Sequence, residues 1–82
     1  MKKKAEKLVL LGNQVKKFRK ELGISQEKLA EICEFDRTYI SLIERGQRNI
    51  SFINLLRLAN GLNTTPSILI KDLEYDNSTS SK

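Results

Sequence analysis

The 82-residue sequence contains no histidine and only one cysteine, Cys33. A single thiol cannot close a disulfide within the chain, and one cysteine without histidine does not supply the ligands of a zinc site. The thiol fits a reducing compartment, where a buried cysteine packs as a small hydrophobic side chain. The sequence also shows no phosphate-binding loop and no pair of acids in a plausible pocket. These absences argue against an enzyme, and we expect neither a metal nor another cofactor.

Long apolar runs are missing as well. No stretch approaches the roughly 20 apolar residues that span a bilayer, and the lysine-rich start leads into an amphipathic segment rather than a signal peptide. We therefore expect no membrane partner and a cytoplasmic, nucleoid-associated location. The composition, 39% hydrophobic and 30% charged, is typical of a small folded domain. We expect residues 1–73 to form this domain, with a basic arm at residues 1–4, and residues 74–82 to be a polar, disordered tail.

Basic residues outnumber acidic ones by 15 to 10, which gives a net charge of +5. A basic balance favours a polyanionic partner, and nucleic acid before a membrane surface. Many proteins with the same balance bind neither, so the charge alone does not assign a function. Lys16, Lys17 and Lys20 allow two interpretations, a solvated helix face or direct contact with phosphate.

The spacing of apolar residues predicts an all-α domain with five helices and no strand. Residues 5–22, 52–62 and 66–73 carry the first, fourth and fifth helices, and the two short helices between them are joined by a tight turn. Gly23 ends the first helix, because glycine adopts the left-handed conformation without steric cost. Side-chain oxygens that can accept free backbone N–H groups mark the starts of the later helices. These N-caps are Ser25, Asp36, Ser51 and Thr65.

The third helix is apolar on one side and mostly polar on the other. Ile40 and Ile43 lie at helical spacing and face inward, whereas the outer face and the loop that follows carry hydrogen-bonding groups. A short helix of this kind is suited to insertion into the major groove of DNA. The outer residues of this helix and loop are Arg37, Thr38, Ser41, Leu42, Arg45, Arg48 and Asn49.

The fourth and fifth helices contain more apolar residues than one buried stripe requires. The surplus predicts a second apolar contact, and we expect a homodimer interface there. A two-fold dimer would place its two recognition helices about 34–36 Å apart on a near-palindromic operator. The alternative is that these residues fill the core of the domain itself. The residues expected at the interface are Ile53, Leu69 and Ile70.

One sequence pattern runs through the predicted helices from the first to the fourth. It comprises Arg19, the run LGISQEKLA from Leu22 to Ala30, the run ISLIERG from Ile40 to Gly46, and Leu58, Ala59 and Leu62. In this register the chain resembles the helix-turn-helix domain of the lambda-repressor and Cro type, known as the XRE family, over about three quarters of its length. With Arg37–Ser41, Arg48 and Asn49 added, it looks most like the controller proteins of restriction–modification systems, which are small dimers without a ligand-binding domain.

The resemblance implies which side chains read the DNA sequence. Arg37 and Thr38, followed by Ser41 and Leu42 one turn later, would contact base edges. A guanidinium offers two parallel donors to guanine, a contact worth about 1–3 kcal/mol of discrimination, although Arg37 could instead pair with a neighbouring carboxylate. Thr38 could meet a thymine methyl, a phosphate or only solvent. Leu42 stands where several relatives have a polar residue, so it could meet only a thymine methyl or an apolar surface.

The resemblance also assigns residues to the DNA backbone and to the protein interior. Gln26 would anchor a phosphate and brace the third helix, with a free polar side chain as the alternative. Tyr39 would contact phosphate or be partly buried with its hydroxyl in water. Arg19 and Glu44 match an internal ion pair between the first and third helices. The residues implied at the DNA backbone are Gln26, Tyr39, Arg45, Arg48 and Asn49.

These observations favour a sequence-specific transcriptional regulator that acts as a homodimer. As a controller protein it would regulate its own and neighbouring genes according to its own concentration. Its partners would be double-stranded DNA, a second copy of itself and RNA polymerase. A phage-type repressor or an antitoxin would use the same chemistry on another target. The alternative from another class is a protein-interaction adaptor that kept the fold and lost DNA binding, against which the basic outer face argues.

Overall fold

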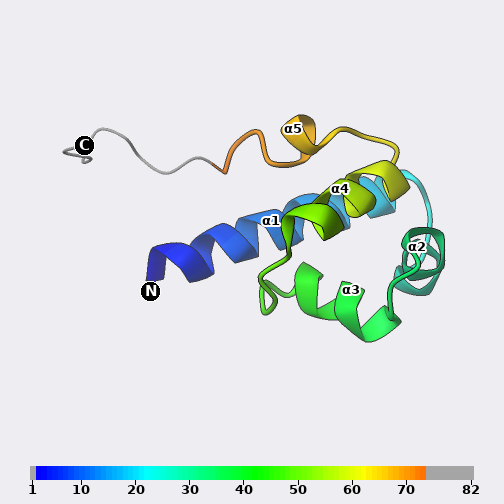
Figure 1. The fold of residues 1–82 in the computed structure, drawn as a ribbon, viewed down its shortest axis with the longest axis horizontal. Helices are drawn as coiled ribbons and strands as arrows, with labels where there is room; N and C mark the ends of the chain where they lie inside the picture. The colour runs from blue at the N-terminus through cyan, green and yellow to red at the C-terminus, as the bar shows by residue number, and fades with distance from the viewer. Residues whose placement is uncertain (1, 74–82) are drawn as a thin grey trace.

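A computed structural model of the chain describes residues 2–73 (Figure 1). This part of the chain is all-helical and has no strand, as the apolar spacing predicted. No helix in residues 2–73 combines the length and the apolar character needed to cross a membrane. The helices are α1 Lys2–Glu21, α2 Gln26–Cys33, α3 Arg37–Glu44, α4 Phe52–Gly61 and α5 Pro66–Leu69.

Two helix ends differ from the prediction. Helix α1 begins at Lys2 rather than at residue 5, so the lysines expected in a separate basic arm belong to its backbone; lysine is a good helix former and does not interrupt a helix. Helix α5 stops at Leu69 instead of near Leu73. After it the chain turns again, with the Leu73 N–H donating to the Ile70 carbonyl at 3.0 Å. The predicted tail, residues 74–82, lies outside the described residues.

The predicted helix caps are present. Each capping oxygen accepts a backbone N–H three residues later, or two for Asp36, at 3.0–3.2 Å. Gly23, expected to end α1, has φ +72°, and Asn63, after α4, has φ 60°. The helix boundaries therefore follow from local side-chain chemistry. The capping residues are Ser25, Asp36, Ser51 and Thr65.

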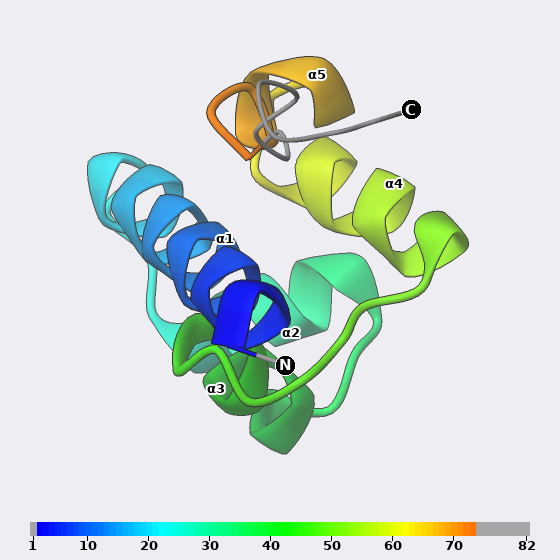
Figure 2. The same ribbon diagram turned by 90° about the vertical axis from the view of Figure 1, so that its left-hand side faces the viewer.

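Helices α2 and α3 lie on one side of the molecule and α5 on the other, with α1 and α4 between them (Figure 2). Helix α3 packs on α1 and α2, and α4 packs on α2 and α5. The approach of α1 to α3 is close, because a Cβ at Gly12 would stand 2.6 Å from the Glu44 carbonyl oxygen. The core side chains are Leu11, Val15, Leu29, Ala30, Cys33, Ile40, Ile43, Leu58, Ala59, Leu62 and Leu69.

The burial of two leucines departs from the sequence interpretation. Leu22, the last residue of the predicted first helix, is 43% exposed, because α1 ends at Glu21 and does not carry this side chain onto its buried face. Leu69 was expected on a dimer interface and is completely buried in the core. The short helix α5 turns this side chain inward, so the interpretation that α5 fills its own domain core holds for this residue.

Candidate nucleic-acid interface

Helix α3 divides its residues between the core and one outer surface. Ile40 and Ile43 have no more than 1% of their surface exposed, which anchors the inner face. On the outer side, four residues line one hollow of about 210 Å³. They follow the spacing of one helix face, so the fold brings together three of the four predicted base-reading residues. The residues around this hollow are Arg37, Thr38, Ser41 and Arg45.

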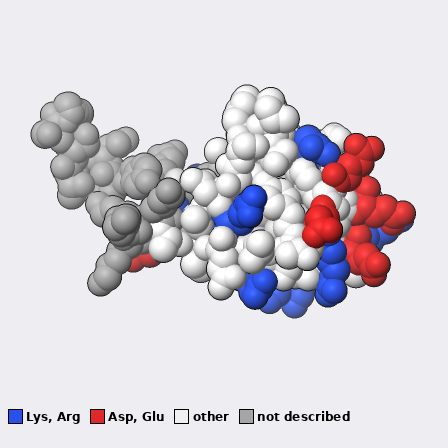
Figure 3. Space-filling view, turned by 60° about the horizontal axis from the view of Figure 1, so that its bottom comes forward, with Lys and Arg blue, Asp and Glu red and all other residues white. Residues whose placement is uncertain are grey.

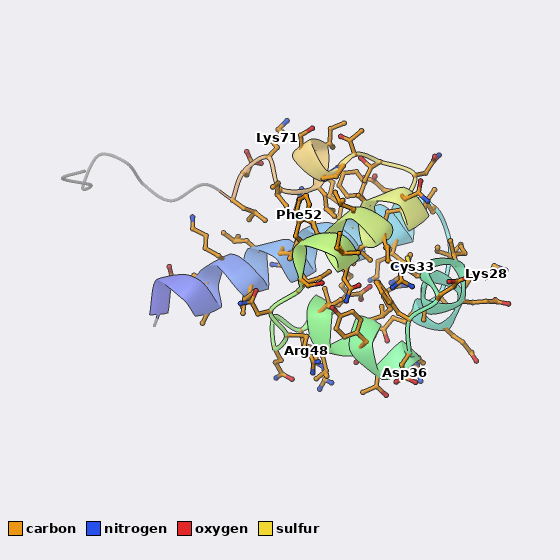
Figure 4. The ribbon with its side chains drawn as sticks, in the orientation of Figure 1. Lys28, Cys33, Asp36, Arg48, Phe52 and Lys71 are labelled. Atoms are coloured by element: carbon orange, nitrogen blue, oxygen red, sulfur yellow. The ribbon has the colours of Figure 1, made fainter. Side chains whose placement is uncertain are left out.

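The fourth predicted reader, Leu42, lies on the edge of the same helix and is half-buried. Its side chain does not line the hollow. The loop after α3 continues the outer surface with Arg48 and Asn49, both exposed. Figure 4 shows Asp36 and Arg48 on the same side of the molecule, at opposite ends of α3, and Lys71 on the far side. The outer surface of α3 therefore begins at the capping residue Asp36 and continues after the helix into the basic loop that carries Arg48.

A buried network holds α3 to the rest of the domain. The predicted ion pair is present: Arg19 Nε donates to Glu44 Oε2 at 2.6 Å, and Nη2 donates to Oε1 at 3.1 Å. Arg19 Nη1 also donates to the Ile24 carbonyl at 2.8 Å. Gln26 Nε2 donates to Glu44 Oε1 at 3.0 Å, so its expected bracing contact is formed. With both charges buried and fully bonded, removal of one partner would leave an unpaired charge inside the protein.

Tyr39 is more firmly held by the protein than the sequence indicated. Its hydroxyl accepts a hydrogen bond from Asn54 Nδ2 of α4 at 3.0 Å. Its ring meets the Phe35 ring edge-on, with centroids 4.9 Å apart. The Arg48 guanidinium lies 5.4 Å from the centre of the Tyr39 ring. Asn54 and Phe35 therefore hold Tyr39 in place, a role that nothing in the spacing of the sequence distinguished.

Arg57 is a further residue that the sequence interpretation missed. Its guanidinium reaches the turn between α2 and α3 and lies 4.6 Å from the centre of the Phe35 ring. The available signal was a lone cation within an apolar helix. Behind the turn, burial raises the pKa of the Cys33 thiol, an effect that the charge of Arg57 partly opposes. Cys33 thus stays a neutral core side chain at neutral pH.

The proposed dimer surface contains two exposed members of the predicted three. Ile53 is 59% exposed and Ile70 is 37% exposed, while Leu69 has no accessible surface in this structure. Phe52 at the start of α4 is 70% exposed (Figure 4). Exposed apolar side chains that gather in one patch often mark a contact with another molecule. The exposed apolar side chains of α4 and the α5 region are Phe52, Ile53, Leu56, Ile68 and Ile70.

Charge is distributed unevenly over the surface. In Figure 3 acidic side chains gather at the end of the molecule where α2 lies, and most of the basic ones visible from this side follow the lower edge. Glu27 and Glu31 of α2 are exposed. The three arginines of the α3 surface and its loop, Arg37, Arg45 and Arg48, are exposed too. A basic surface with hydrogen-bonding side chains between its cations can attract a phosphate backbone and contact base edges.

Comparison with known proteins gives consistent matches. The helix-turn-helix family HTH_3 matches residues 15–69. The control protein C.MunI from Mycoplasma sp is 46% identical over 69 residues, which cover 83% of this chain and 93% of that protein. The control protein C.BamHI from Bacillus amyloliquefaciens is 43% identical over 63 residues, or 76% of this chain and 78% of that protein. In the crystal structure of the restriction-modification controller protein C.AhdI from Aeromonas hydrophila, 94% of that chain matches 76% of this one with 44% identity and a TM-score of 0.74.

Proposed function

Because this chain belongs to the helix-turn-helix family of restriction–modification controller proteins, which regulate transcription, we propose that it binds a near-palindromic operator as a homodimer. Through that operator it would control its own gene and the neighbouring ones. The observation that carries the proposal is the hollow on the outer face of α3, where two arginines flank Thr38 and Ser41. Its site of action would be the chromosomal or plasmid DNA of the cytoplasm.

Base readout is assigned to the outer face of α3. Arg37 would bind a guanine through two donors to O6 and N7. Thr38 and Ser41 have small side chains beside it, suited to a thymine methyl or to single hydrogen bonds. Leu42 would add only apolar contact at the edge of the groove, since it is half-buried and lies outside the hollow.

Phosphate contact is assigned to residues around this face. Arg45 Nε already donates to the Ser41 carbonyl at 3.3 Å, which leaves its terminal nitrogens for phosphate. Arg48 is held over the Tyr39 ring, and Asn49 follows it in the exposed loop. The Tyr39 hydroxyl accepts from Asn54 and therefore keeps its own proton to donate to a phosphate oxygen.

At the second helix, Gln26 would serve the DNA backbone from the first residue of α2. One amide hydrogen is used by Glu44, so the other is available to a phosphate, together with the backbone N–H groups of the first turn. The bracing contact and the phosphate contact are thus compatible.

Dimer formation is assigned to α4 and the α5 region. Ile53 and Ile70 remain the proposed interface residues from the sequence, and the exposure of Phe52, Leu56 and Ile68 supports a larger apolar contact around them. Leu69 supports this surface from the core instead. Such a dimer presents one α3 helix to each half of the operator. RNA polymerase is the further partner that we propose, because a dimer bound beside a promoter would activate or repress, according to the position of the operator, by contacting polymerase or by blocking it.

The test is binding to the DNA upstream of the gene. Fluorescence anisotropy with a duplex containing the near-palindrome should show an affinity about 10³-fold or more above that for a scrambled duplex at the same salt concentration. Equal binding to both duplexes would contradict sequence-specific regulation, and no binding to either would favour the adaptor. An adjacent methyltransferase or endonuclease gene would identify the genes under control.

A further inference from the structure

Arg57 extends from α4 to the turn of the helix-turn-helix, although it is not among the residues proposed to contact DNA. Its Nη2 donates to the carbonyl oxygens of Cys33 at 2.8 Å and of Glu34 at 3.2 Å. The last carbonyls of an α-helix have no partner within the helix, and the negative end of the helix dipole favours a cation. Arg57 therefore completes the C-terminal end of α2 from outside the helix-turn-helix.

Glu34, the residue that ends α2, gives this contact its importance. Its backbone has φ 62° and ψ 41°, the left-handed conformation that glycine adopts readily and other residues adopt at a cost. The Glu34 carboxylate also lies 3.9 Å from the Arg57 guanidinium. Arg57 thus donates to the carbonyl, and lies within ion-pair distance of the carboxylate, of the residue whose conformation directs the chain from α2 toward α3.

A line of ring contacts continues from the turn into α3. The Arg57 guanidinium lies 4.6 Å from the Phe35 ring centre, and the Phe35 ring meets the Tyr39 ring of α3 edge-on. Tyr39 in turn lies under Arg48. Cation–ring and ring–ring contacts have preferred geometries. These contacts therefore favour one orientation of the first turn of α3 relative to α4.

We propose that Arg57 is a positioning residue for sequence readout, which fixes the turn and thereby the orientation from which Arg37 and Thr38 reach the bases. The inference rests on the proposed DNA-binding function. A two-donor contact with a base edge depends on the direction of α3, whereas long cationic side chains adapt to phosphates. Arg57 therefore controls the preference for the operator over other DNA, and much less the total affinity for DNA.

The experiment compares Arg57→Ala with Lys71→Ala, which removes the same charge on the side of the molecule opposite Arg48 (Figure 4). Dissociation constants for the operator and for a scrambled duplex are measured at one salt concentration by fluorescence anisotropy. Arg57→Ala should lower the ratio of operator affinity to scrambled-duplex affinity roughly 10-fold, because the charge-assisted hydrogen bonds that hold the turn are lost. Lys71→Ala should leave that ratio unchanged, because it should weaken binding to both duplexes equally.

Two further variants separate positioning from general loss of structure. Arg57→Lys keeps the charge but cannot lie flat on the Phe35 ring, so its ratio should fall between those of the wild type and Arg57→Ala. Glu34→Gly in the Arg57→Ala background removes the cost of the left-handed conformation, so it should restore part of the operator preference. Because this glycine would also stabilise the fold as a whole, the ratios are compared under conditions in which urea unfolding shows every variant to be fully folded; a rescue that persists there reports on the turn and not on general stability.

Amide hydrogen exchange of the free protein gives the matching readout without DNA. Exchange of the Phe35 N–H, which donates to the Ala30 carbonyl at 2.8 Å, should accelerate in Arg57→Ala and not in Lys71→Ala. If the wild type prefers the operator but Arg57→Ala and Lys71→Ala have the same ratio of operator affinity to scrambled-duplex affinity, the inference about Arg57 is overturned and the proposed function stands. A wild type without operator preference would overturn the proposed function, and the role in readout with it. If Arg57→Ala does not fold, Arg57→Lys decides, and an unchanged ratio there overturns the inference.

Discussion

The α2–α3 unit and the α4–α5 side of the molecule differ in how completely their side chains are buried or bonded within one chain. The first has a buried inner face, and its charged and aromatic side chains are engaged by α1 and α4, through Arg19, Asn54 and Arg57. The second leaves large apolar side chains exposed, Phe52 and Ile53 above all. One chain therefore builds the outer face of α3 by itself, while the α4–α5 side leaves apolar surface exposed that the proposed dimer would cover. Four predictions test this difference.

The largest effect is expected from the buried ion pair of the α2–α3 unit. Arg19→Ala should lower the free energy of unfolding by about 3–5 kcal/mol, because Glu44 would remain as an unpaired charge in the core. Urea unfolding followed by circular dichroism measures this. Lys28→Ala is the control, since its ion pair with Glu31 is exposed at both partners and is worth about 0–1 kcal/mol. Equal losses in the two variants would show that the network does not hold α3.

A charge on the α4 surface should act on assembly instead of folding. Ile53→Asp should weaken dimerisation roughly 100-fold or more, because an exposed position tolerates aspartate in the monomer but an apolar interface does not. Sedimentation equilibrium gives the dimer dissociation constant. Leu10→Asp on α1, where the leucine is 43% exposed, is the matched control and should leave it unchanged. A wild type that stays monomeric at micromolar concentration would remove the dimer from the proposal.

Within the α2–α3 unit, base-reading and phosphate-binding arginines should be separable. Arg37→Ala should relax the preference at one operator position by about 1–3 kcal/mol. Arg48→Ala should weaken binding to all sequences and reduce the salt dependence by roughly one phosphate contact. Competition with single-base operator variants over a range of salt concentrations distinguishes them. Unaltered affinity and preference in Arg37→Ala would exclude Arg37 from readout.

The smallest effect concerns Cys33, where α2 packs on α4. Its pKa is raised by burial, so above the ordinary thiol pKa the folded state binds more protons than the unfolded state. The contribution of this thiol to the free energy of unfolding is fully present below the unfolded pKa of about 8.5 and is lost as the pH rises through the folded pKa. The free energy of unfolding should fall less steeply between pH 8 and 10 in Cys33→Ala than in the wild type. Parallel curves would show that the thiol is not desolvated.

Local chemistry determined what could be predicted. The N-caps, the glycine that ends α1 and the inner face of α3 each depend on residues close in sequence, and the structure contains them. The Arg19–Glu44 pair, 25 residues apart, was accessible only through resemblance. Asn54 and Arg57 were missed, and the burial of Leu69 was only an alternative, because all three depend on how α4 and α5 meet the other helices, and no spacing along one helix reveals that.

The close approach of α1 to α3 has a consequence for how this protein can change. Gly12 faces the carbonyls of Ile43 and Glu44 without room for a Cβ, so α3 packs here directly against the backbone of α1. A library randomised at the hollow, residues 37, 38 and 41, should yield variants with new operators. A library randomised at residue 12 should return glycine. The outer face of this eight-residue helix can therefore vary with the DNA target, whereas the face that packs on Gly12 has to stay constant.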